Sequence, residues 1–274
     1  MPSGETNPSP HYGTWIRVRA IVVFASLTAA FLVLASMAFL TPWALLALVP
    51  AGAFGWILIV LLAARWRFSD SGGGYQARIH QLIVERASGV RILDIGCGNG
   101  HLAIELAKAA PGRSVIGLDY WGSAWEYSQQ TCERNAEIEG VGEQVTFVRG
   151  SASALPFTDG EFDCVVSCLT FHEVRDLADK TEALTEALRV LAPGGTFVFF
   201  DLFSDRTPYP DQRLIGERLE QNGGKAVADV ELSSLLRLPF PLQGKRLLKH
   251  ARLISRRRAV LKSGDSAIPA AKAV

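Results

Sequence analysis

A run of 45 residues, from position 20 to position 64, contains no Asp, Glu, Lys, Arg or His. An α-helix crosses the hydrocarbon core of a bilayer in about 20 residues, so the run has the length of two crossings and a turn. Thr41-Pro42 marks the turn, which gives predicted spans over residues 20–40 and 43–64. We expect Pro50 to kink the second span. The run predicts a two-helix transmembrane hairpin.

The charges that flank this run predict its orientation in a membrane. Arg17 and Arg19 precede the first span, Arg65 and Arg67 follow the second, and the turn is uncharged. By the positive-inside rule, we expect a protein of the inner membrane with both ends of the chain in the cytoplasm. We expect three tryptophans to lie at the two membrane interfaces: Trp15 and Trp66 on the inner side and Trp43 on the outer side. A cleaved signal peptide is the alternative, but its apolar core has only about 7–15 residues.

Composition divides the chain into five predicted segments. They are a polar cytoplasmic tail (1–19), the hairpin (20–66), a Gly-rich linker (67–74), a folded domain (75–262) and a flexible tail (263–274). Residues 1–13 are rich in Pro, Ser and Gly and are expected to be disordered. Three consecutive glycines are expected to make the linker flexible. The four cysteines lack zinc-type spacing, so we expect reduced thiols and no metal site.

The folded domain alternates strand and helix patterns, which is typical of an α/β protein with a parallel sheet. Expected strands cover residues 90–95, 114–119, 144–149, 162–168, 196–201, 226–232 and 250–257. Expected helices cover residues 75–87, 100–110, 123–138, 177–191 and 211–221. In such sheets, ligands bind at the carboxyl ends of the strands.

The first of these strands ends in a glycine-rich turn, Asp94-Ile95-Gly96-Cys97-Gly98-Asn99-Gly100. Glycines let backbone amides approach a ligand closely, and the following helix directs its N-terminal amides to the same point. A glycine turn alone is also compatible with a dinucleotide site. Asp94 favours a ligand that carries a positive charge, because its carboxylate would repel a pyrophosphate.

The stretch Leu-Asp-Ile-Gly-Cys-Gly-Asn-Gly resembles motif I of the class I methyltransferases that use S-adenosylmethionine. Residues 150–157, 162–168 and 189–195 are similar to later segments of that family, in the same order. The resemblance covers roughly residues 75–258. It implies a Rossmann-like fold with a seven-stranded sheet whose last strand is antiparallel, and S-adenosylmethionine as the cofactor.

The resemblance also assigns roles to individual residues. It implies that the glycine turn packs on the methionine part of the cofactor, with Asp94 near its amino group. Asp119 ends the second strand and is expected to accept from the two ribose hydroxyls. Ser151 departs from the family, which has an Asp there as an acceptor for adenine. The expected cofactor-binding residues are Asp94, Gly96, Cys97, Gly98, Gly100, Asp119, Tyr120, Ser151, Ala152 and Cys168.

Three residues are candidates for acid–base chemistry. The methyl carbon of a sulfonium is electrophilic, so positioning a nucleophile beside it supplies most of the acceleration. A base is needed only where the acceptor loses a proton. His172 follows the fourth strand and titrates in the range suited to a general base; a capping histidine is the alternative. Glu173 and Asp201 are weaker candidates.

The leading hypothesis is a methyltransferase anchored in the membrane and acting on a small acceptor at its cytoplasmic face. The hairpin and the apolar stretch 235–242 favour a lipophilic acceptor, such as a quinone, isoprenoid, fatty acid or phospholipid compound. Nine Lys or Arg and no Asp or Glu occupy residues 237–262, which suits contact with anionic membrane lipids or a solvated edge. Nucleic acid is not an expected partner. The alternatives are a silent cofactor-binding module, motivated by Ser151, and a nicotinamide-dependent oxidoreductase.

Overall fold

The computed structural model describes residues 9–123, 125–222 and 224–258. A single sheet has the strand order β3-β2-β1-β4-β5-β7-β6. The strands are β1 (Arg91–Ile95), β2 (Ser114–Asp119), β3 (Val145–Arg149), β4 (Phe162–Cys168), β5 (Leu191–Asp201), β6 (Gly224–Glu231) and β7 (Arg252–Arg258). The helices of this domain are α3 (Tyr75–Val84), α4 (His101–Lys108), α5 (Gln129–Ile138), η4 (Phe171–Glu173), α6 (Glu182–Arg189), α7 (Arg213–Gln221) and α8 (Leu232–Leu235).

The sheet has the predicted Rossmann-like topology. Strands β1 to β5 pair in parallel, and β7 lies antiparallel between β5 and β6. The seven-stranded sheet and its antiparallel last strand are therefore confirmed. The predicted end of the domain, residues 259–262, and the tail 263–274 lie outside the described residues.

Successive side chains along the strands point to two different hydrophobic cores. Ile92 packs on the side of α3, α4 and α5, whereas Leu93 packs on the side of α6 and α7. Both residues are fully buried. This alternation is the period of a strand that is covered on both faces, and it explains why β1 and β4 are apolar almost throughout.

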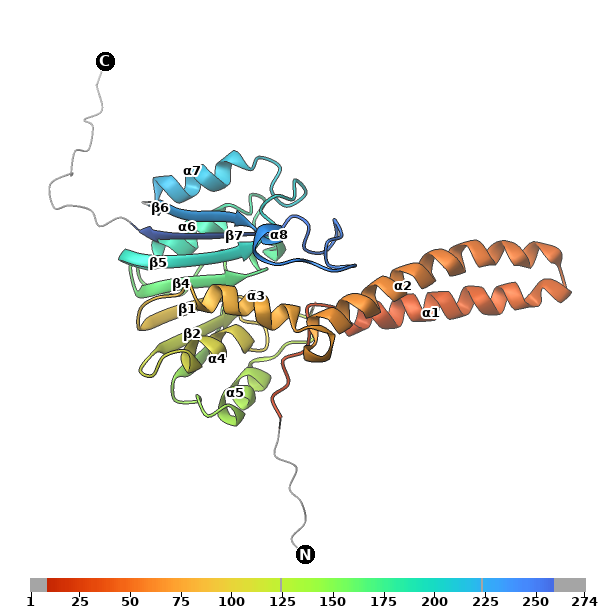
Figure 1. Cartoon of the computed structure of the whole chain (residues 1–274), viewed down its shortest axis with the longest axis horizontal. Helices are drawn as coiled ribbons and strands as arrows, with labels where there is room; N and C mark the ends of the chain where they lie inside the picture. Colours follow the sequence, from red (N-terminus) through yellow and green to blue (C-terminus); the bar gives the residue numbers. More distant parts are fainter. Residues whose placement is uncertain (1–8, 124, 223, 259–274) are drawn as a thin grey trace, which may run out of the picture.

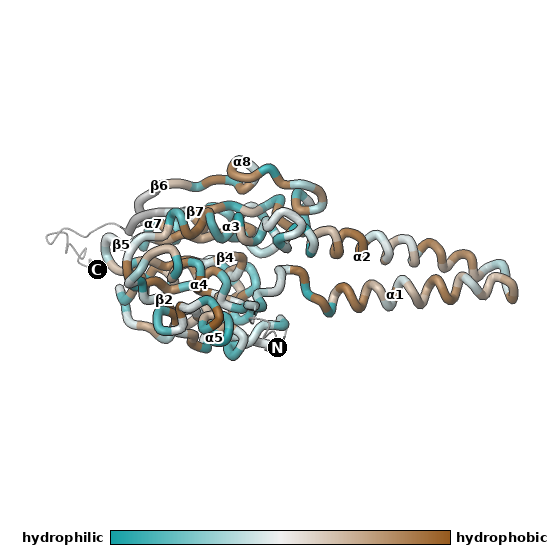
Figure 2. Tube along the Cα trace, turned by 60° about the horizontal axis from the view of Figure 1, so that its bottom comes forward, coloured by the Kyte–Doolittle hydropathy of each residue, from teal (hydrophilic) through white to brown (hydrophobic). Residues whose placement is uncertain are grey.

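Two long helices project from the edge of the domain as a hairpin (Figure 1). They are α1 (Val18–Ser36) and α2 (Leu48–Phe68), joined by the short helices η1 (Met37–Phe39) and η2 (Pro42–Ala47). The spans Val18–Phe39 and Pro42–Phe68 are long and apolar enough to cross a membrane, and few of their residues are buried in the protein. In Figure 2 the tubes of both helices are coloured mostly from white to brown, the apolar half of the scale. Near the turn, Phe39 is 81% exposed and Trp43 77% exposed.

Pro50 does not kink a continuous helix, contrary to the prediction. It lies in the first turn of α2, directly after the 3-10 helix η2. A proline at this position removes no intrahelical hydrogen bond, because the first N–H groups of a helix have no partner within it.

Residues 69–74 of the predicted linker form a folded turn, and its first two residues, Arg67 and Phe68, belong to α2. Its short helix η3 (Asp70–Gly72) packs under the end of α2, and the Gly74 amide donates to the Ser69 carbonyl at 2.9 Å. A Cβ on Gly72 would lie 1.6 Å from the Trp66 carbonyl oxygen, so only glycine fits there. The hairpin is thus joined to α3 by a compact turn.

The polar tail was also mispredicted in part, since residues 9–17 pack on the domain. The Asn135 side chain makes two hydrogen bonds to the backbone of His11: its Oδ1 accepts from the His11 N–H at 2.8 Å, and its Nδ2 donates to the His11 carbonyl at 3.1 Å. Trp15 is not a free interfacial residue, because its ring packs on Phe68 and His80. Residues 1–8 of the predicted tail lie outside the described part of the chain.

Candidate active site

A cavity of about 660 Å³ opens at the carboxyl ends of β1, β2 and β4. Its volume is in the range of about 300–1,000 Å³ that is typical of small-molecule sites. Nine of the ten predicted cofactor residues and the predicted base line it: Asp94, Gly96, Cys97, Gly98, Asp119, Tyr120, Ser151, Ala152, Cys168 and His172. Gly100 is not among the lining residues.

The glycine turn is shaped by contacts that exclude side chains. Gly96 has φ of 78°, and a Cβ there would lie 2.0 Å from the Thr170 hydroxyl oxygen. Gly100 begins α4 with φ of 81° and packs on Phe147. The role of Gly100 is therefore to start the helix with a left-handed residue, which favours glycine. Gly96 and Gly98 bring the backbone to the cavity wall.

Asp94 is the least satisfied polar group in the cavity wall. It is 1% exposed, and neither carboxylate oxygen makes a hydrogen bond to another described residue. Burial, with the charge of Asp119 in addition, raises the pKa of Asp94 to about 8, although the nearby Ala103 amide acts in the opposite direction. A buried carboxylate of this kind gains most from a ligand that brings a cation or N–H donors. The ammonium-bearing end of S-adenosylmethionine fits that requirement.

Asp119 shapes the cavity through the backbone around it. Its two oxygens accept from the amides of Gly98 at 2.9 Å and Trp121 at 2.8 Å. The Trp121 indole in turn donates to the Gly98 carbonyl at 2.9 Å. Burial raises the pKa of Asp119, while these amide donors oppose the rise. Each oxygen retains a lone pair that a ribose hydroxyl can use.

Ser151 has an acidic neighbour that sequence reasoning missed. The Ser151 hydroxyl donates to Asp176 Oδ2 at 3.2 Å, and the Ser153 hydroxyl donates to the same oxygen. Hydrogen bonding by Ser153 is the main reason why the pKa of Asp176 is lowered. Asp176 lines the cavity beside Ser151. The chain thus has a carboxylate near the position where the family has its Asp, which removes the motive for a silent module.

The thiols in the cavity wall are neutral. All four cysteines are free, and burial raises the pKa of both Cys97 and Cys168 well above the ordinary value. A protonated thiol is a weak donor and a poor nucleophile. Cys97 and Cys168 therefore contribute a compact, nearly apolar surface to the site.

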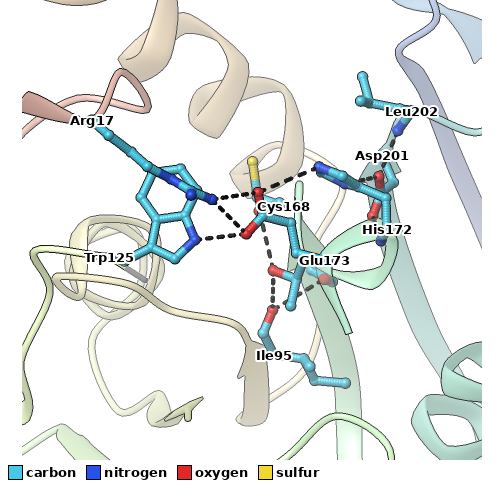
Figure 3. A network of polar contacts seen from close by, with 10 residues as sticks. Arg17, Ile95, Trp125, Cys168, His172, Glu173, Asp201 and Leu202 are labelled. Carbon is cyan, nitrogen blue, oxygen red and sulfur yellow. Dashed lines mark hydrogen bonds and ion pairs between the residues drawn. The ribbon is translucent and has the colours of Figure 1, made fainter. Parts of the chain in front are cut away.

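A cluster of charged and aromatic groups surrounds the candidate base (Figure 3). His172 Nδ1 lies 2.6 Å from Asp201 Oδ1, and the carboxylate is completely buried. Glu173 lies on the other side of the imidazole, with its Oε1 4.0 Å from His172 Nε2. Arg17 contacts both Glu173 oxygens at 3.1 and 3.2 Å, and the Trp125 indole donates to Oε2 at 2.6 Å. All three sequence candidates meet here.

The cluster sets the charge of the imidazole. Burial lowers the pKa of His172, but Asp201, through its charge and hydrogen bond, and then Glu173 and Asp205 outweigh burial and raise it above the ordinary value. Asp201 also fixes the tautomer, because Nδ1–H donating to the carboxylate leaves Nε2 free to accept a proton. This arrangement suits a general base whose orientation is held by a carboxylate.

The N-terminal strap, residues 11–17, forms one wall of the cavity and was missed from the sequence. Tyr12, Trp15 and Ile16 all line the cavity. The Tyr12 ring stacks on His101 with centroids 4.1 Å apart, and the Asn99 amide donates to the Tyr12 carbonyl at 3.3 Å. The only sequence signal was two aromatic residues in an otherwise polar tail.

Moving the carboxylate from position 176 to position 151 tests whether Ser151 and Asp176 together bind the cofactor. Asp176→Asn should weaken cofactor binding by about tenfold, the lower end for a hydrogen bond to an exposed charged group. Ser151→Asp alone should also weaken it, because two carboxylates would then lie within hydrogen-bonding distance. The double variant should recover most of the wild-type affinity in calorimetric titrations. Tighter binding by Ser151→Asp alone would contradict this role.

Comparisons with known proteins agree with this geometry. The methyltransferase domain family matches residues 93–199. An uncharacterized methyltransferase of Synechocystis is 34% identical over 175 residues, which are 62% of this chain and 76% of that protein. A demethylmenaquinone methyltransferase of Thermus thermophilus is 39% identical over 127 residues, or 46% of this chain and 53% of that protein. The match spans about half the length of that relative.

A solved structure shares the fold. The geranyl diphosphate C-methyltransferase of Streptomyces coelicolor A3(2) superimposes with a TM-score of 0.52 at 16% identity, over 72% of this chain and 82% of that one. At this identity the likeness supports the architecture of the sheet and its helices.

Proposed function

Because the chain belongs to the class I S-adenosylmethionine-dependent methyltransferases, we propose that it is a membrane-anchored enzyme that methylates a small, lipophilic acceptor at the cytoplasmic face. One observation carries the proposal: the cavity that contains the unpartnered Asp94 is also walled by Trp15, Ile16 and Phe68. These three residues lie where the hairpin joins the domain. The site is therefore open to a ligand at the base of the two apolar helices.

The residues of the cavity wall divide between cofactor and acceptor. Asp94, the glycine turn, Asp119 and the Ser151–Asp176 pair would hold S-adenosylmethionine. When bound, this cofactor supplies an electrophilic methyl group. The wall that includes Phe68, Leu202 and Leu247 is apolar and would contact the acceptor.

His172 would remove a proton from the acceptor during or before transfer. Its Nδ1 is held by Asp201, so Nε2 is the nitrogen that can take a proton from a hydroxyl or a carbon acid. Glu173 lies 4.0 Å from Nε2 and stabilises the imidazolium that results. The ion pair with Arg17, at 3.1 Å, fixes the position of this carboxylate.

A quinone-like ring with an isoprenoid chain is the acceptor class that we favour. Two relatives named demethylmenaquinone methyltransferase match 46% and 48% of this chain. The hairpin gives an independent reason, since an enzyme for soluble metabolites gains nothing from two apolar helices. Arginines at the domain end of both helices and an uncharged turn favour cytoplasmic termini and a multi-pass position in the inner membrane.

Labelled methyl donor added to native membranes tests the proposal. Membranes that contain the protein should yield a labelled product that extracts into organic solvent, and membranes without it should not. The matched variant replaces residues 24–60 with a short Gly-Ser loop, which keeps the strap and the packing of Phe68. It should bind cofactor normally and lose most of the activity on membrane-embedded acceptor. A labelled product that stays in the aqueous phase would contradict a lipophilic acceptor.

A further inference from the structure

The segment between α8 and β7 reaches back along the hairpin. In Figures 1 and 2 this connection extends from the domain toward α2. At its tip, the Phe240 ring lies 6.1 Å from the Trp56 ring of α2, measured between centroids, and both residues are more than half exposed. Trp56 precedes Arg65 by nine residues, which is roughly 13 Å along an α-helix. If Arg65 lies at the level of the lipid head groups, Phe240 lies well below them.

The backbone of this tip is suited to an apolar environment. In Leu238-Pro239-Phe240-Pro241-Leu242, the two prolines have no N–H group that would need a partner. The Leu242 amide donates to the Pro239 carbonyl at 2.8 Å, and the Gly244 amide donates to the Pro241 carbonyl at 2.9 Å. Unpaired backbone groups are the main obstacle to placing a loop among acyl chains. The two prolines, these turns and the Leu248 amide, which donates to the Leu242 carbonyl at 3.0 Å, reduce the number of unpaired groups at this tip.

The residues that follow the tip carry only positive charge. Lys245, Arg246 and Lys249 are exposed, and residues 237–258 contain no Asp or Glu. A basic flank beside an apolar tip matches the anionic head groups of a cytoplasmic leaflet above its acyl chains. A loop that only covered the core would need neither the exposed phenylalanine nor this flank.

The other end of the same segment reaches the active site. Arg246, Leu247 and Leu248 line the cavity that contains Asp94 and His172. The base of the segment is held by the Tyr75 hydroxyl, which donates to the Arg237 carbonyl at 3.2 Å. The segment therefore runs without interruption from the side of α2 to the cavity wall.

We infer that residues 238–240, with the exposed Phe240 at their end, form a wedge that enters the cytoplasmic leaflet beside α2, while Leu242 is buried in the core and holds the wedge in place. With α2, the wedge frames the route by which a lipid-chained acceptor reaches the cavity. The wedge rests on the proposed function, since its depth is measured against a membrane-spanning hairpin. It adds a third contact with the bilayer and names the wall along which the acceptor moves. The wedge contacts the acyl chains of membrane lipids, and its function is to separate lipids of the leaflet next to the site.

Depth measurements test the wedge in the full-length protein. Phe240→Cys would be labelled with an environment-sensitive fluorophore and reconstituted into phosphatidylcholine vesicles with a quarter phosphatidylglycerol. Lipids that carry a quencher on the acyl chain should quench it more strongly than lipids quenched at the head group. Two further labelled positions serve as controls. Glu220→Cys lies on α7, is exposed and should stay in water. Thr41→Cys lies at the hairpin turn and should be shielded from a water-soluble quencher added on the side of the catalytic domain. Unsubstituted protein reports labelling of the native cysteines.

The outcomes separate the wedge from the anchor. Acyl-chain quenching at position 240 with a shielded position 41 supports both. Water exposure at position 240 with a shielded position 41 overturns the wedge and leaves the anchored enzyme intact. Water exposure at both positions overturns the anchor itself. As a functional readout, Phe240→Asp should lower label transfer in native membranes by about tenfold, because a carboxylate is strongly disfavoured at this depth, whereas Phe240→Leu should not. Equal rates for the two variants would also overturn the wedge.

Discussion

Replacing His172 with Gln should lower kcat by about 10²- to 10⁴-fold, the usual contribution of a positioned general base. Gln is similar in length and uncharged, so the cavity keeps its shape while Nε2 loses its ability to take a proton. Affinity for S-adenosylmethionine should change little, because the imidazole lies against Asp201 and Glu173 and not beside the glycine turn. Steady-state rates and calorimetric titration of the same preparations measure the two effects separately.

The pH profile supplies the control for this prediction. A base acts in its neutral form, so the rate should fall as the pH drops through the pKa of His172, which lies above its ordinary value. Asp201→Asn removes the main group that raises this pKa, so the inflection should move to lower pH and the maximal rate should fall. A rate for His172→Gln within a few-fold of wild type would show that the acceptor needs no base.

Asp94→Asn should have opposite effects on binding and on stability. It removes the charge that faces the cofactor, and losing a hydrogen bond to a charged group costs about 1.5–3 kcal/mol, or roughly 10- to 150-fold in affinity. At the same time it relieves the burial of a carboxylate that has no hydrogen-bonding partner among the described residues. The variant should therefore bind cofactor poorly and melt at a higher temperature than the cofactor-free wild type at pH 8.

The sign of the stability effect follows from the two pKa values. Unfolded, Asp94 titrates near its ordinary value, about 3.9, and in the folded protein its pKa is about 8. Between these values the folded state holds a proton that the unfolded state has lost, so the free energy of unfolding falls as pH rises and levels off above about pH 8. The slope is at most about 1.4 kcal/mol per pH unit. Melting curves from pH 5 to pH 9 should show this fall in the wild type relative to Asp94→Asn, and parallel curves would contradict it.

The parts of the site that could be predicted are those set by local pattern. Asp119 and Cys168 end their strands and Asp94 is the last residue but one of β1. The carboxyl ends of parallel strands meet at one edge of the sheet, so these positions follow from the order of elements. The same pattern disfavoured a dinucleotide turn, because Asp94 lies where a pyrophosphate would be repelled. Gly100 shows the limit of this reasoning, since a motif residue can serve the helix and not the ligand.

The parts that were missed depend on contacts between distant segments. Arg17 was interpreted only as a flanking charge, yet it pairs with Glu173 and its guanidinium lies over the Trp125 ring at 4.0 Å. Trp125 was expected in a helix over residues 123–138, but α5 begins only at Gln129, with Ser128 as its N-cap. No local period distinguishes such a loop from the first turns of a polar helix. Asp176 was missed for the same reason.

The position of the strap has a consequence for the order in which the protein is made. Arg17 and Glu173 are 156 residues apart in the chain. At synthesis rates of about 5–20 residues per second, Arg17 leaves the ribosome roughly 8 to 30 s before Glu173, and the end of α2 at Phe68 roughly 5 to 20 s before it. The hairpin therefore has time to reach the membrane before the sheet is complete. Arg17, at the end of the strap, has no Glu173 to pair with until η4 is made. A nascent chain arrested before residue 173 should be inserted in the bilayer but unable to retain cofactor.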